Sequence, residues 1–244
     1  MASAAVTPGA ALAGVDQMMQ RSDNRGVAAN ERLTAMAGAV LLVVFVVELA
    51  TVSDLGTLLS AHVFVGVLMA GPLAVKLGST GWRFVRYYTG NPAFVLQGPP
   101  PLPLRLLAPL VVASTLAVVG SGIALVFTGP ASPGPFVALH VISFLVWMPA
   151  IAIHVIGHFL EVPRLIAKDL RRGAPEPAPG RRLRPGVTLG MLAAGAIAAL
   201  LLSPAAAPWI AWIDAGRAPG SAFFVVGLGL AAGGILVARL FRWW

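Results

Sequence analysis

The four histidines of this 244-residue chain are the residues best suited to chemistry, and all four fall inside long apolar stretches. His62 lies in one stretch, whereas His140, His154 and His158 share another. An ionisable side chain within a membrane span is costly and marks a candidate functional site. A lone histidine there often only hydrogen-bonds to a neighbouring helix, but four histidines confined to two helices favour a shared role.

The spacing of the histidines indicates where they lie along a helix. His140 and His154 are fourteen residues apart. At about 100° and about 1.5 Å per residue, this spacing leaves them on one face and roughly 21 Å apart along the axis. His158 follows one turn after His154 on the same face. We therefore expect one histidine of this helix near the outer leaflet and two near the inner leaflet.

His62 matches His140 in depth, because each lies about four residues inside the outer end of its apolar stretch. Two imidazoles from different helices at one depth can hold a planar macrocycle between them, as in a bis-histidine haem b site. Zinc or copper would need three or four close ligands. Gly66, one turn after His62, would leave space for a flat ring. The sequence thus predicts a haem b between His62 and His140.

The inner end has no matching pair, because the position fourteen residues after His62 is Lys76. Three interpretations stay open. The amine of Lys76 extends to the inner interface, or it ligates a second haem iron opposite His154 in its neutral form, or His158 serves as a ligand, a propionate partner or a group behind a ligand. Whether a second haem is present is left open.

Glu48 lies near the outer end of the first apolar stretch, within reach of the depth of His62. A carboxylate there can pair with a group of the haem site or accept a proton from a quinol. The alternative is a carboxylate that extends to the outer interface.

The elements that must position these side chains are membrane-spanning helices. The chain is 58% hydrophobic and 11% charged, whereas soluble domains carry roughly a quarter charged residues. Its apolar blocks each approach the roughly 20 residues that a helix needs to cross a bilayer. The sequence predicts an all-α bundle with six spans, at 33–52, 58–77, 104–127, 136–160, 187–206 and 222–240.

The basic residues predict the orientation of this bundle. All 17 lysines and arginines except Arg217 lie on one side of the bundle: before span one, at or between the facing ends of spans two and three, between spans four and five, or at or after the end of span six. The positive-inside rule places that side, and both termini, in the cytoplasm. This topology accounts for the net charge of +8, so nucleic acid is not expected as a partner.

The chain divides into four predicted segments. They are a flexible cytoplasmic tail (1–32), a four-helix haem-binding bundle (33–160), a basic Pro-rich loop (161–186) and two additional spans (187–244). The Pro-rich run 98–103 is expected to be an extended connector. The absence of cysteine excludes disulfides, iron–sulfur clusters and covalently attached haem. No Gly-rich nucleotide loop is present, so electrons would have to pass to another chain or to a quinone.

The paired histidines of spans two and four, with His140-x₁₃-His154, resemble the prokaryotic cytochrome b561-like and ferric-reductase-like membrane haem b proteins. The resemblance covers about 33–160. It implies electron transfer in the bacterial inner membrane, with His62 and His140 as outer-haem ligands and His154 as the inner-haem ligand. Where members with two haems offer a fourth ligand, this chain has Lys76. Any enzymatic role would be that of a membrane oxidoreductase subunit with a redox partner protein. The alternative function is a non-haem anchor subunit or small transporter with packing or proton-relay histidines.

Overall fold

The computed structural model describes residues 8–170, 179–217 and 220–241, and every regular element in these ranges is a helix. The predicted all-α class is therefore confirmed. Within the described residues, six helical segments are long and apolar enough to cross a membrane, in the order that the sequence predicts. These segments are Asn24–Val52, Leu55–Tyr88, Leu102–Thr128, Phe136–His158, Leu183–Arg217 and Ala222–Leu240.

The first helix begins well before the apolar block that marks the first span. The sequence predicts a flexible tail at 1–32, but α1 runs from Pro8 to Val52 without interruption; residues 1–7 lie outside the described part. Val27 is buried in a small apolar cluster with Ala93 and Phe94. This tertiary contact gives the end of the predicted tail a packing partner, which hydropathy alone does not reveal.

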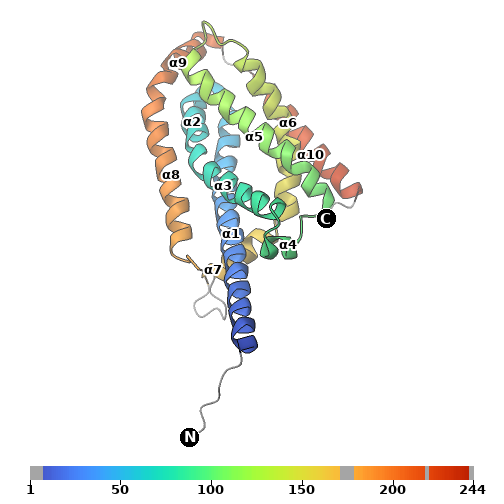
Figure 1. The fold of residues 1–244 in the computed structure, drawn as a ribbon. Coiled ribbons are helices and arrows are strands. Elements are labelled where there is room, and N and C mark those ends of the chain that lie inside the picture. Colours follow the sequence, from blue (N-terminus) through green and yellow to red (C-terminus); the bar gives the residue numbers. More distant parts are fainter. Residues whose placement is uncertain (1–7, 171–178, 218–219, 242–244) are drawn as a thin grey trace.

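The second span consists of two helices joined at Met69, α2 (Leu55–Leu68) and α3 (Ala70–Tyr88). Met69 itself has helical backbone angles, and Figure 1 shows α3 inclined to α2. Pro72 has no N–H to offer the carbonyl of Leu68 four residues earlier. The helix continues beyond the predicted end at residue 77, so the basic residues expected in the following loop begin on α3.

The other connections are also more helical than the sequence predicts. The expected extended connector is non-helical only at 98–101, because α5 begins at Leu102 with prolines in and before its first turn. The expected loop at 161–186 contains a helix and the start of the fifth span, and residues 171–178 lie outside the described part. The remaining elements are α4 (Pro92–Gln97), α5 (Leu102–Thr128), α6 (Phe136–His158), α7 (Glu161–Leu170), α8 (Leu183–Leu202), η1 (Ser203–Ala206), α9 (Ala207–Trp212), η2 (Ile213–Arg217) and α10 (Ala222–Leu240).

The helices form two groups that pack side by side. Helices α1, α2, α3 and α8 contact one another, and α6 packs against both α5 and α10. Figure 1 shows α8 and α10 on opposite flanks, with α9 at one end of the bundle and α4 and α7 towards the other. The groups meet where α2 contacts α5 and where Phe45 of α1 packs on Trp147 of α6, with ring centroids 4.8 Å apart.

Glycines allow the flanking helix α8 to touch the backbone of α2 and α3. A Cβ atom on Gly71 would lie 1.9 Å from the carbonyl oxygen of Met191, and one on Gly195 would lie 2.3 Å from that of Leu68. Small residues permit such close approach in membranes. The Leu68 carbonyl is the one that Pro72 leaves without a helical donor, and Gly195 covers it with a Cα–H contact.

Replacing Gly71 or Gly195 with alanine is expected to push α8 away from the α2–α3 junction. The forced displacement of two backbones should cost about 2 kcal/mol or more and lower the thermal unfolding midpoint, followed by tryptophan fluorescence in detergent. Gly78→Ala on α3 is the matched control, because its added Cβ would meet no atom within 4 Å. Equal midpoints for Gly71→Ala and Gly78→Ala would contradict this packing.

Candidate functional site

His62 and His140 lie next to each other in the structure, as their predicted depths indicate. Their ring centroids are 6.2 Å apart and their planes are inclined by 77°. His62 comes from α2 and His140 from α6, so the pair bridges the two groups of helices. Both side chains are partly buried.

The ring of His62 is held through its Nδ1 atom by α1. This nitrogen lies 2.9 Å from Oε1 of Glu48 and 3.1 Å from Oγ1 of Thr51. The Thr51 hydroxyl donates its proton to the backbone carbonyl of Glu48 at 2.6 Å, so it accepts from His62. With two acceptors facing it, Nδ1 of His62 carries the proton. Glu48 is thus directed at His62 and not towards an interface.

The ring of His140 is also held through Nδ1, in this case by α5. The carbonyl oxygen of Val118 lies 2.9 Å away and Oγ of Ser121 lies 3.2 Å away. A carbonyl only accepts, so the tautomer assigned from these partners has the proton on Nδ1. In the neutral rings of His62 and His140, Nε2 therefore carries a free lone pair.

Both Nε2 atoms are open. Among the described residues, every hydrogen bond of His62 and His140 is made at Nδ1. An imidazole fixed at one nitrogen by a carboxylate or a backbone carbonyl, with the other nitrogen free, is the usual arrangement of a metal-ligating histidine. The pair can therefore offer two lone pairs to a shared ligand or metal ion.

Two glycines make room for this arrangement. A Cβ atom on Gly66 would lie 3.2 Å from Oε1 of Glu48, so the carboxylate uses the space that the sequence assigns to a flat ring. A Cβ atom on Gly122 would lie 3.0 Å from Cε1 of His140. Sequence analysis misses Gly122 and the α5 groups that hold His140. The available signal is a Ser and a Gly in adjacent positions of an apolar helix, at Ser121 and Gly122.

Lys76 is engaged by the first helix. Its Nζ atom donates to the backbone carbonyl of Thr34 at 3.1 Å, and a Cβ atom on Gly38 would lie 3.0 Å from Nζ. The amine is thus directed at α1. The contact joins α1 to α3.

The other two histidines are neighbours on α6. The ring centroids of His154 and His158 are 4.9 Å apart, and Nδ1 of His158 lies 2.9 Å from Oε2 of Glu161. These rings come from a single helix, whereas His62 and His140 come from two. The structure therefore brings His62 and His140 together across the bundle, and it places His154 beside His158.

The functional assignment depends on this geometry. In the described part of the chain, no group of three or more His, Asp or Glu side chains is placed to hold a metal ion. No family model matches the chain, and no curated protein or solved structure matches it. His62 and His140 are therefore the two side chains of the described structure that could share one metal ion across the bundle.

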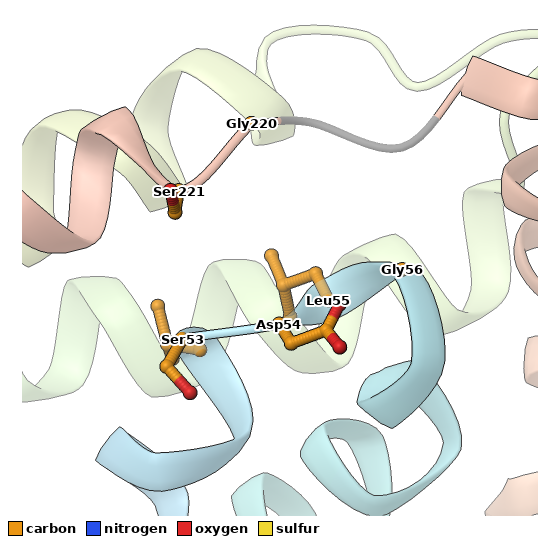
Figure 2. Close-up of a pocket in the computed structure, with 7 residues that line it drawn as sticks. Ser53, Asp54, Leu55, Gly56, Gly220 and Ser221 are labelled. Atoms are coloured by element: carbon orange, nitrogen blue, oxygen red, sulfur yellow. The ribbon is translucent and has the colours of Figure 1, made fainter.

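A surface hollow of about 290 Å³ lies where α1 turns into α2, directly after Thr51 in the chain. Figure 2 shows Asp54 in its lining, with Gly220 and Ser221 on the opposite side. Asp54 caps α2, since its carboxylate accepts from the hydroxyl of Thr57 at 2.6 Å and from the N–H of Thr57 at 3.3 Å. Hydrogen bonding from Thr57 lowers the pKa of Asp54 below its ordinary value of 3.8.

The capping role of Asp54 predicts a pH-dependent contribution to stability. Because the folded pKa is lowered, the contribution is present above the ordinary pKa and is lost as the pH falls through the lowered value. Asp54→Ala should reduce the thermal midpoint at pH 7, and the difference from the wild type should shrink below about pH 4. Asp214→Ala is the control, because Asp214 is another exposed carboxylate and lies in η2. A difference that does not change with pH would contradict the assignment.

Proposed function

We propose that the chain is an integral membrane b-type cytochrome, which transfers electrons through a haem b held between His62 and His140. The observation that supports this function is the geometry of the pair. Two imidazoles from different helices are each fixed at Nδ1, and both leave Nε2 open at a ring separation of 6.2 Å.

The donor set fits haem iron. A metal lies about 2 Å from a ligating imidazole nitrogen, so two imidazoles on opposite sides of one ion have centroids roughly 6 Å apart. His62 and His140 would hold the iron of a haem, and the haem would supply the remaining ligands. A structural zinc site would require four protein ligands, and the described residues do not group three.

The protein would orient the cofactor and exclude water from it. A bound haem supplies one-electron redox chemistry. Glu48 and Thr51 fix the direction of the His62 ring, and the Val118 carbonyl fixes that of His140. Helix α8 packs against α2, and helix α10 packs against α6.

The rest of the proposal concerns membrane and partners. The apolar helices indicate a multi-pass membrane protein. We place it in a bacterial inner membrane with cytoplasmic termini, where a quinone and a redox partner protein would exchange electrons with it. The case for a second haem at His154 is weaker, because His158 shares its helix and the amine of Lys76 is bound to Thr34.

The spectrum of the purified protein tests this function. Protein from haem-replete cells should show a Soret band, a reduced α-band and about one haem b per chain. His62→Ala and His140→Ala should each abolish these bands, because each removes an axial ligand. His158→Ala is the control and should retain them, since its ring is bound to Glu161 away from the pair. A colourless, folded wild-type preparation would contradict the proposal.

A second candidate function is proton transfer through a small transporter. The close contact between Glu48 and His62, at 2.9 Å inside a span, favours it. In this case proteoliposomes would take up protons, Glu48→Gln would stop the uptake, and no haem spectrum would be seen.

A further inference from the structure

The two rings of the site are held by different kinds of acceptor. Nδ1 of His62 donates to a carboxylate, that of Glu48, whereas Nδ1 of His140 donates to an uncharged backbone carbonyl. A neutral acceptor is enough to fix the tautomer and the direction of an imidazole, as it does for His140. The negative charge of Glu48 is therefore not needed to fix the orientation of the His62 ring, and it can have a further effect on that ring.

We propose that Glu48 is a positioning residue that lowers the reduction potential of the metal held by His62. This inference rests on the proposed function. A carboxylate that accepts from Nδ1 draws the proton towards itself and gives the ring partly anionic character, so Nε2 becomes a stronger donor. A stronger donor favours the oxidised, more positive iron over the reduced one.

The carboxylate of Glu48 is held against His62 from two sides. The hydroxyl of Thr51 bonds to the Glu48 backbone carbonyl and lies 3.4 Å from Oε2. On α2, the missing side chain of Gly66 leaves the space next to Oε1. The sequence thus supplies a hydroxyl and a glycine at the two positions that decide where the carboxylate lies.

The charge of Glu48 is also poorly screened. Its side chain is 14% exposed and that of His62 is 18% exposed. Among the described residues, its ion pair is with His62, and no lysine or arginine lies within ion-pair distance. Charges interact more strongly in such a low-dielectric setting than in water, so most of the effect of the carboxylate falls on the imidazole.

The test is a redox titration of the purified holoprotein carrying Glu48→Gln, which removes the charge and retains a similar shape. We expect haem to remain bound and the midpoint potential to rise. A tenfold change in the ratio of oxidised to reduced binding corresponds to about 59 mV for a one-electron couple, and we expect a shift of that order.

Glu161→Gln is the matched control. Glu161 also lies 2.9 Å from Nδ1 of a histidine, but that histidine is His158, outside the bridging pair. Its removal should leave the potential unchanged. Glu48→Asp keeps the charge and withdraws it by one methylene, so its potential should lie between those of the wild type and Glu48→Gln.

The outcomes separate the two proposals. A wild-type protein without haem overturns the proposed function itself. A haem-containing Glu48→Gln variant with the wild-type potential overturns only the role of Glu48. If that variant does not fold, Glu48→Asp decides alone, and an unchanged potential in it again overturns the role of Glu48.

Discussion

In hydrocarbon, a polar group must find its hydrogen-bond partner within the protein, and this constraint orders the interior of the bundle. His62 meets it through Glu48 on α1, and His140 meets it through the carbonyl of Val118 on α5. The indole of Trp147 on α6 donates to a threonine hydroxyl on α5. Each of these bonds joins two helices of the same group, so polar pairing fixes α1 to α2 and α5 to α6.

The position of the His62 and His140 rings follows from the division of the bundle into two groups of helices. Each group satisfies its own histidine, and the contacts between the groups are mainly apolar, as in the packing of Phe45 on Trp147. Glycines allow α8 to pack closely on α2–α3, and α10 to pack closely on α6. These contacts join α8 to one group and α10 to the other. The rings of His62 and His140 lie where the two groups meet.

The sequence predicts the number, order and approximate centres of the spans, because hydropathy directly reports which residues can lie in lipid. It does not predict where the helices end. The apolar block is shorter than the helix that contains it. Helix α1 therefore extends back to Pro8, and α3 extends forward to Tyr88. The pairing of His62 with His140 is also predictable, since depth along two parallel helices that both start at the outer side follows from residue counting.

The partners of the two rings are not predictable in this way. Whether Glu48 faces His62 depends on the rotation of α1 about its own axis, and hydropathy along the span reports depth in the membrane rather than rotation. The same holds for α5, which presents Val118 and Ser121 to His140. An amphipathic helix would reveal its rotation through its polar face, but these helices do not.

The contrast with Lys76 shows why the His62–His140 pair stands apart. Lys76 is a polar group in a span, and its amine is satisfied by the carbonyl of Thr34 in a space left by Gly38. That contact accounts for the lysine as a link between α1 and α3. At His62 and His140 the hydrogen bonds of the described residues involve Nδ1 only, and the two rings lie 6.2 Å apart between their centroids. A histidine held at one ring nitrogen with the other nitrogen unbonded is the usual arrangement of a metal ligand, and this separates the pair from Lys76.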